Sequence, residues 1–273
     1  MTGGALRRVW GPVYRHLALY RRSWPRLLEL MYWPVLQMLV WGFVTSYVGG
    51  NVGAAGGAAG AFGVAAGVLL GGVLLWEVAL RAQMGFAVSF LEEIWSRNLG
   101  HVFVSPLRPR ELLAALMGMS LLRTAVGVAP AALLAWALYG FGLLSVGPVV
   151  VAHFAALVLM GWAVALAVTA MILRHGAGAE ALAWSVLFGL APFSAVFYPV
   201  SALPEAARWV AHAIPAAHVF EGMRAALAGQ PPAWGHLAAA FGLDALWLAL
   251  GGWAFLAQFR AARERGALLN VGE

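Results

Sequence analysis

Six long apolar runs constrain the fold of this chain more than any other feature of its sequence. They cover residues 27–48, 61–80, 112–138, 149–173, 179–197 and 237–259. About 20 apolar residues are enough for a helix to cross the hydrocarbon core of a bilayer. The chain is 63% hydrophobic and only 10% charged, whereas soluble domains are typically about half apolar and a quarter charged. We therefore expect an all-α integral membrane protein whose 273 residues form a single domain with six transmembrane helices.

Two residue types are missing from the chain, and their absence excludes several activities. There is no cysteine, which excludes disulfides, thiolate chemistry and cysteine-ligated metals. All 17 basic residues are arginines, whereas a P-loop needs a lysine to reach the phosphates. No Gly-x-Ser-x-Gly or His-Glu-x-x-His pattern is present either. We expect no catalytic residue and no cofactor in this chain, so any ATP and Mg that power it would be bound by a partner chain.

The arginines are distributed unevenly between the two ends of the expected spans. Six crossings place both termini on one side with 14 arginines, while the other side has two and Arg123 lies within the third span. Arginines mark the cytoplasmic side, so we expect both termini in the cytoplasm and the chain in a bacterial cytoplasmic (inner) membrane. This asymmetry accounts for the basic pI of about 10.5, and we expect no nucleic-acid partner. The 14 are Arg7, Arg8, Arg15, Arg21, Arg22, Arg26, Arg81, Arg97, Arg108, Arg110, Arg174, Arg260, Arg263 and Arg265; the two are Arg208 and Arg224.

Two further segments are expected to lie at the membrane surface. Residues 5–24 combine arginines with aromatic residues, a composition typical of a helix that lies in the membrane interface. Residues 198–234 are broken by five prolines into two short amphipathic helices, at 205–213 and 216–228. Because these helices are too short to span, we expect a re-entrant or interfacial hairpin on the outer side.

Five charged residues fall within the expected spans, and Glu77, Arg123 and Asp244 are the three considered as candidate functional residues. A charge inside the bilayer is costly and is usually paired. We expect Glu77, near the cytoplasmic end of the second span, to be the partner of Arg123. Arg123 is then either part of a structural ion pair or a contact for substrate or gating, and both hypotheses stay open. Asp244, two turns into the sixth span, is expected to face the interior or water.

The outer hairpin has two pairs of opposite charges at helical spacing. Residues three apart are neighbours on a helix surface, so each pair favours an ion pair. We expect the pairs mainly to fix the hairpin, with substrate contact as the alternative. His212, His218 and Glu221 are conceivable metal ligands, but two histidines at this spacing form no strong metal motif, and we expect no metal site. The pairs are Glu205/Arg208 and Glu221/Arg224.

The most polar internal stretch is 90–110, FLEEIWSRNLGHVFVSPLRPR, between the second and third spans. Glu92, Glu93 and Arg97 lie close to Trp95 in the sequence, and prolines downstream end any helix. A polar elbow of this kind is either a passive connector or a docking surface for a soluble partner.

Several of these stretches resemble the ABC-2-type transporter permease family, the membrane subunits of type-2 ABC exporters. They are LLELMYWPVLQMLVWGF in the first span, FLEEIWSRNLGHVFVSPLRPRELL in the elbow and FYPVSALPEAARWVAHAIPAAHVFEGMRAAL before the last span. The resemblance covers essentially the whole chain, and the third stretch is its most specific part. It implies six spans, a homo- or heterodimer of permeases and two separate ATPase subunits. It also implies that the elbow forms a coupling helix in a groove of the ATPase.

A coupling role suits the residues of the elbow. A helix that carries force from a soluble motor needs a large apolar plug surrounded by charges that set its register. We expect Ile94 and Trp95 to form the plug, and Glu92, Glu93 and Arg97 to orient it. Replacing Trp95 with Ala, or both glutamates with Arg, is expected to uncouple transport and leave the membrane fold intact.

The expected function is that of the permease subunit of an ATP-driven exporter. Walls rich in Leu, Val, Phe and Trp would exclude a small hydrophilic ion because its desolvation cost would be large. We therefore expect an amphipathic, lipid-linked or hydrophobic substrate that moves outward. Expected partners are an ABC ATPase, a second permease copy that packs through the first and fifth spans, and membrane lipid. The alternative is an ATP-independent channel, carrier or scaffold, although the sequence has no evident inverted repeat of the kind found in carriers.

Overall fold

The computed structural model describes residues 2–54, 59–96, 107–142 and 147–264, and these fold almost entirely into helices. No strand occurs within those ranges, which confirms an all-α membrane protein. Three short 3-10 turns, at Gly176–Ala179, Ala191–Phe193 and Val200–Ala202, connect the later helices. The helices are α1 (Thr2–Arg22), α2 (Trp24–Ala54), α3 (Ala59–Trp95), α5 (Pro109–Tyr139), α6 (Val149–His175), α7 (Ala181–Leu190), α8 (Glu205–His212), α9 (Pro215–Leu227) and α10 (Trp234–Glu264).

Five of the described helices are long and apolar enough to cross a membrane, namely α2, α3, α5, α6 and α10. The expected fifth span, 179–197, is a shorter apolar segment in which α7 has only ten residues. At 1.5 Å per residue, α7 is about 15 Å long, half of a hydrocarbon core of about 30 Å. The 3-10 turn before it and Pro192 just after it explain why this helix is short.

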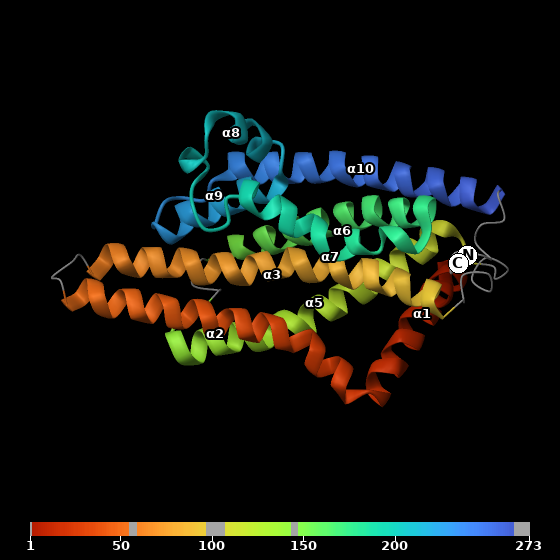
Figure 1. The fold of residues 1–273 in the computed structure, drawn as a ribbon, viewed down its shortest axis with the longest axis horizontal. Coiled ribbons are helices and arrows are strands. Elements are labelled where there is room, and N and C mark those ends of the chain that lie inside the picture. Colours follow the sequence, from red (N-terminus) through yellow and green to blue (C-terminus); the bar gives the residue numbers. More distant parts are fainter. Residues whose placement is uncertain (1, 55–58, 97–106, 143–146, 265–273) are drawn as a thin grey trace.

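The core of the bundle is built on α3 and α6. Along their apolar stretches 72% of α3 and 78% of α6 is buried within the protein, against 17% of α2 and 22% of α10. α3 packs against α5 and α6, and α6 packs against α10 (Figure 1). α2 and α10 are therefore outer helices, with apolar faces left for lipid or another chain.

Glycines let the backbones of neighbouring helices come into direct contact. A Cβ added at Gly161 of α6 would lie 2.8 Å from the carbonyl oxygen of Ala79 in α3. One added at Gly251 of α10 would lie 2.8 Å from the carbonyl oxygen of Ala163 in α6. Small residues at such crossings are typical of helix packing in membranes, where close contact replaces the hydrophobic effect.

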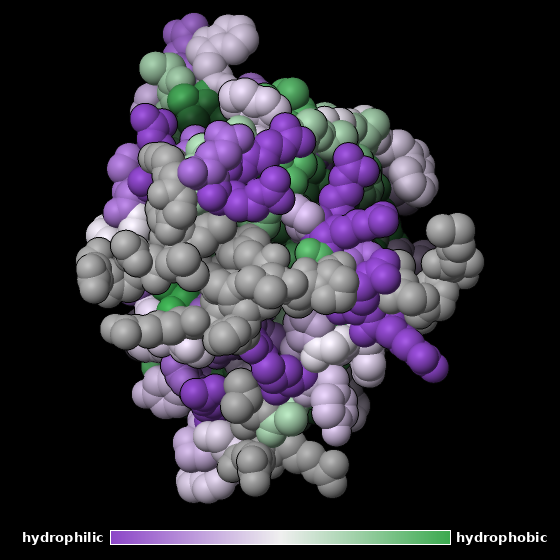
Figure 2. Space-filling view, turned by 90° about the vertical axis from the view of Figure 1, so that its right-hand side faces the viewer, coloured by the Kyte–Doolittle hydropathy of each residue, from purple (hydrophilic) through white to green (hydrophobic). Residues whose placement is uncertain are grey.

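The two ends of the bundle differ in their charges. α1 and α5 begin at the same end at which α3, α6 and α10 finish (Figure 1). We call this the arginine-rich end, and hydrophilic residues gather around its described surface (Figure 2). The opposite end carries α8 and α9, and we call it the hairpin end. The hairpin expected at 198–234 thus contains two helices, and α9 packs against α3, α6 and α10.

Candidate functional site

The first part of the stretch expected to be an elbow is the last part of α3. This helix runs without interruption to Trp95, and its final turns bury Phe90, Leu91 and Ile94 in the main apolar core. The prediction that Ile94 projects toward a partner is therefore wrong, because the side chain is only 5% exposed and packs inside the bundle. Trp95 is 52% exposed, and its coupling role stays a prediction. Arg97 lies outside the described residues, so its coupling role stays a prediction.

The two adjacent glutamates of α3 are held by residues from α1 and α5. We call Arg15, His16, Glu92, Glu93 and Arg123 the charge cluster. Arg123 Nη2 donates to Glu92 Oε2 at 2.8 Å, and His16 Nδ1 lies 3.1 Å from the same oxygen. His16 Nε2 lies 3.3 Å from Glu93 Oε1, and Arg15 forms an ion pair with that oxygen. The cluster thus joins three helices at the arginine-rich end.

Most of the charge cluster is buried. His16 and Glu93 are 2% exposed and Arg123 is 3% exposed. Charges are tolerated at such depth only when they are paired and hydrogen-bonded, since removing them from water costs several kcal/mol per ion. Burial lowers the pKa of the Arg15 guanidinium, although the Glu92 carboxylate acts to raise it. Burial likewise raises the pKa of the Tyr20 hydroxyl, whose ring lies 5.1 Å from the Arg123 guanidinium.

These positions revise two sequence-based predictions. Arg123 pairs with Glu92 rather than with Glu77, because Glu77 already has Arg81 one helical turn away, at 3.3 Å. The spacing of Glu77 and Arg81 was a signal for this pair that the sequence analysis did not use. Reversing the charges of Glu92 and Glu93 would also strip buried partners from α1 and α5, so it cannot leave the fold intact as expected.

Another ion pair fastens α1 to the start of α5. Arg8 Nη2 lies 2.7 Å from Glu111 Oε1, and Glu111 also accepts the backbone N–H of Arg108 at 3.0 Å. At the same end Trp95 Nε1 donates to Glu180 Oε1 at 2.8 Å, which links the end of α3 to the start of α7. The end of α3 is therefore connected to α1, α5 and α7 at once.

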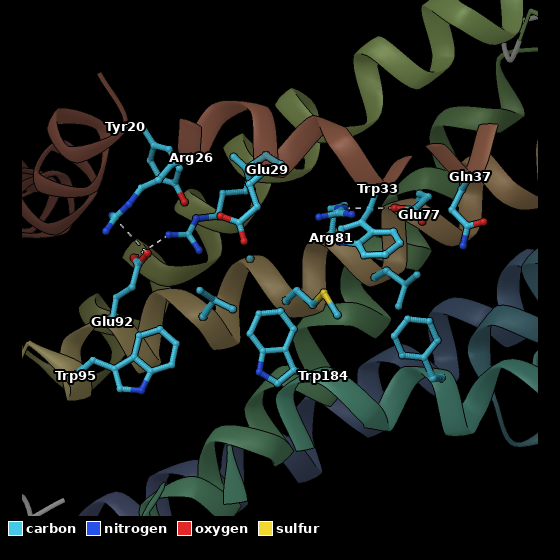
Figure 3. A pocket seen from close by; sticks show the side chains of 17 residues that line it. Tyr20, Arg26, Glu29, Trp33, Gln37, Glu77, Arg81, Glu92, Trp95 and Trp184 are labelled. Carbon is cyan, nitrogen blue, oxygen red and sulfur yellow. Dashed lines mark hydrogen bonds and ion pairs between the residues drawn. The ribbon is translucent and has the colours of Figure 1, made fainter. Parts of the chain in front are cut away.

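A cavity of about 690 Å³ lies between α2, α3, α5 and α7 (Figure 3). Glu92 and Trp95 lie toward one end of it and the Glu77–Arg81 pair toward the other, with Trp184 on the facing wall (Figure 3). Ligand pockets of this size typically combine apolar walls with a few polar groups that fix orientation. The cavity can therefore hold a molecule with an apolar body and polar groups. The sequence analysis missed its lining residues Glu29, Trp33, Gln37 and Trp184, because they come from helices far apart in the chain.

At the hairpin end, charged side chains hold the backbone. Glu221 accepts the N–H of Val200 at 2.6 Å and forms the expected ion pair with Arg224, at 3.1 Å. Arg224 also donates to the carbonyl oxygen of Ala195, which has a left-handed φ of 52°. Burial acts to raise the pKa of Glu221, but the hydrogen bonds from Val200 and Arg224 outweigh it and hold that pKa below its usual value.

The other expected pair of the hairpin is not formed. Arg208 donates to the carbonyl oxygens of Leu203 at 2.8 Å and Ser201 at 2.7 Å. Within the described ranges no ion pair joins Arg208 to Glu205, so the prediction of that pair is wrong.

Asp244 faces the interior of the bundle, which is one of the two positions expected for it, the other being water. It is fully buried, and within the described part of the chain neither carboxylate oxygen has a hydrogen-bond partner.

Five helices long and apolar enough to cross a membrane place the described part of the chain among all-α integral membrane proteins. Comparison with protein families is more specific, because the ABC-2 type transporter model matches residues 13–228, well over half of the chain. The chain therefore belongs to the ABC-2 type transporter family, and it is a permease subunit rather than an ATPase. The match starts within α1 and ends just after α9, so it includes the charge cluster and the hairpin helices. No curated protein matches the sequence.

Proposed function

We propose that this permease exports an amphipathic, lipid-linked or hydrophobic molecule outward across a bacterial cytoplasmic membrane. The observation that carries the proposal is the cavity between α2, α3, α5 and α7, with aromatic walls and buried ion pairs. Such a lining accepts an apolar body and orients a polar group, whereas a free small ion would lose its hydration without enough replacement ligands.

A separate ABC ATPase supplies the energy in this proposal. The chain has no lysine and hence no P-loop, so ATP and Mg are bound by the partner. The partner docks at the arginine-rich end in this proposal, because an excess of 14 arginines over two favours a cytoplasmic position for that end by the positive-inside rule. Both termini are then cytoplasmic, and α8 and α9 face outward.

A second permease copy completes the substrate route. α2 is only 17% buried along its apolar stretch, and the cavity lies between α2 and α7. A second copy packed on these two helices would cover the apolar face of α2 and close the cavity toward lipid. Cysteine pairs placed in α2 and α7 of an otherwise cysteine-free chain should crosslink two copies. A monomer that engages a single ATPase would contradict the dimer.

The direct test is transport into inverted membrane vesicles that contain the chain and its ATPase. We expect ATP-dependent accumulation of a member of one substrate class among drugs, glycolipids, polysaccharides and hydrophobic metabolites. ATP-dependent accumulation of a small ion alone would contradict the proposed substrate class. Transport that proceeds without any ATPase would instead support an ATP-independent channel or carrier.

A further inference from the structure

Three histidines meet at the hairpin end, one from each of α8, α9 and α10. The ring centroids of His212 and His218 are 5.9 Å apart, and those of His218 and His236 are 5.6 Å apart. Of these three histidines, the sequence pointed only to His212 and His218, together with Glu221. The fold adds His236, which is 18 residues from His218 along the chain.

One hydrogen bond fixes the tautomer of His218. Its Nε2 lies 3.0 Å from the backbone carbonyl oxygen of His212. A carbonyl oxygen can only accept, so Nε2 carries the proton and Nδ1 keeps a free lone pair. Histidines that bind metals are oriented in this way, with one ring nitrogen donating to a carbonyl or carboxylate and the other facing the ion.

The lone pair of His218 Nδ1 faces a second imidazole nitrogen. His236 Nδ1 lies 3.3 Å away, within hydrogen-bond distance, so without an ion His236 Nδ1–H donates to this lone pair, and a bound ion would replace that proton. Two nitrogens bound to one tetrahedral zinc ion at about 2.0–2.1 Å are separated by about 3.4 Å. The observed separation therefore matches two ligands of a single ion.

We propose that His218 and His236 bind one Zn²⁺ ion; Cu²⁺ also favours imidazole ligands and serves as its spectroscopic probe. Glu221 is not a third ligand, because its carboxylate is occupied by Val200 N–H and Arg224. Across the described ranges, no group of three His, Cys, Asp or Glu side chains is placed to hold a metal. The site thus has two protein ligands, and water fills the remaining positions. A bound ion would connect α9 to the first turn of α10 and so fasten the hairpin to the last span.

Copper binding to the purified full-length chain, carrying an affinity tag without histidine, tests this proposal. The electron paramagnetic resonance spectrum of one bound Cu²⁺ should show coupling to two imidazole nitrogens. Losing an outer partner of a metal ligand weakens affinity roughly 10–100-fold, and losing a ligand itself should cost at least as much. We therefore expect His236→Ala and His218→Ala each to weaken binding tenfold or more.

Two matched variants serve as controls. His212→Ala keeps the backbone carbonyl that orients His218, and His175→Ala removes an exposed imidazole at the opposite end of the bundle. Both should bind Cu²⁺ like the unaltered chain. Zn²⁺ should raise the thermal midpoint of the unaltered chain, and this rise should vanish in His236→Ala, whose side chain lies near the surface at the start of α10.

Three outcomes would overturn the proposal. The first is unchanged Cu²⁺ affinity in both His218→Ala and His236→Ala. The second is a spectrum without coupling to two nitrogens. The third is a loss in His212→Ala as large as in the other two, which would replace the two-histidine site with a different ligand set. If His218→Ala fails to fold, His236→Ala decides between binding and no binding by itself.

Discussion

The two ends of the bundle use charged side chains in different ways. At the arginine-rich end, charges on separate helices pair with one another, and Glu92 has three basic neighbours within 4.0 Å: Arg123, His16 and Arg26. At the hairpin end, Glu221, Arg224 and Arg208 hold backbone groups of the segment between α7 and α8. Side chains that pair with side chains can exchange partners when a helix moves. Side chains that hold backbone groups keep a loop in one shape. The arginine-rich end therefore joins separate helices, whereas the hairpin end fixes the backbone of one connecting segment.

The largest expected effect comes from removing Arg123. Arg123→Met leaves the part-buried Glu92 carboxylate without its closest cation, and breaking a buried ion pair costs about 3–5 kcal/mol. The free energy of unfolding in mixed micelles should fall by an amount near the lower figure, because His16 and Arg26 remain beside Glu92. In the double variant Glu92→Gln/Arg123→Met, part of the loss should be recovered. Equal stability of the single variant and the unaltered chain would mean that the cluster does not hold the helices together.

Trp95 tests whether the arginine-rich end passes motion to a partner. Trp95→Ala removes a half-exposed aromatic ring at the end of α3, and losing such an anchor at an interface costs about 2 kcal/mol, roughly 30-fold in affinity. Permease abundance should stay normal, while copurification of the ATPase weakens and export is lost. Trp95→Phe keeps the ring but loses the bond to Glu180, so it separates docking from the α3–α7 link. Normal ATPase binding and normal export in Trp95→Ala would make this segment a passive connector.

A smaller effect is expected at the hairpin end. Glu221→Gln keeps an acceptor for the N–H of Val200 but weakens the interaction with Arg224, which should cost about 0.5–1 kcal/mol for a partly exposed pair. Glu221→Gln should not alter ATPase binding, because Glu221 lies at the end of the bundle opposite the proposed docking site. Glu205→Gln is the matched control, since Glu205 has no ion pair with Arg208, and its stability should change by less than about 0.5 kcal/mol. Equal losses in the two variants would contradict the assignment of Glu221 as the residue that holds the loop.

The smallest expected effect is a loss, at acidic pH, of the stability that Glu221 contributes at the hairpin end. The pKa of Glu221 is held below its usual value, so its ionised form contributes stability above the unfolded pKa of about 4.3. That contribution should disappear as the pH falls through the lower folded pKa. The stability difference between the unaltered chain and Glu221→Gln, measured by thermal unfolding between neutral pH and pH 3, should therefore shrink only below about pH 4.3. A difference that is constant over this range would show that the charge of Glu221 is not involved.

The fold was largely predictable because hydropathy reports burial in lipid directly. It located α2, α3, α5, α6 and α10, but it overestimated the length of α7 because apolar composition does not reveal where a helix breaks. Local charge spacing predicted the Glu221–Arg224 pair. It could not predict that Arg8 meets Glu111 from 103 positions away, since no periodicity relates residues on different helices. The buried position of Ile94 was missed for a similar reason, because polar neighbours in sequence concealed its contact with the core.

The close crossing of α10 and α6 restricts which substitutions can be fixed at Gly251 during evolution. Gly251 and Gly252 are adjacent, yet a methyl group at Gly251 would collide with the backbone of α6, whereas one at Gly252 would meet nothing within 4 Å. Selection should therefore purge every replacement at Gly251 and accept many at Gly252. Two neighbouring codons that specify the same amino acid would then accumulate changes at very different rates.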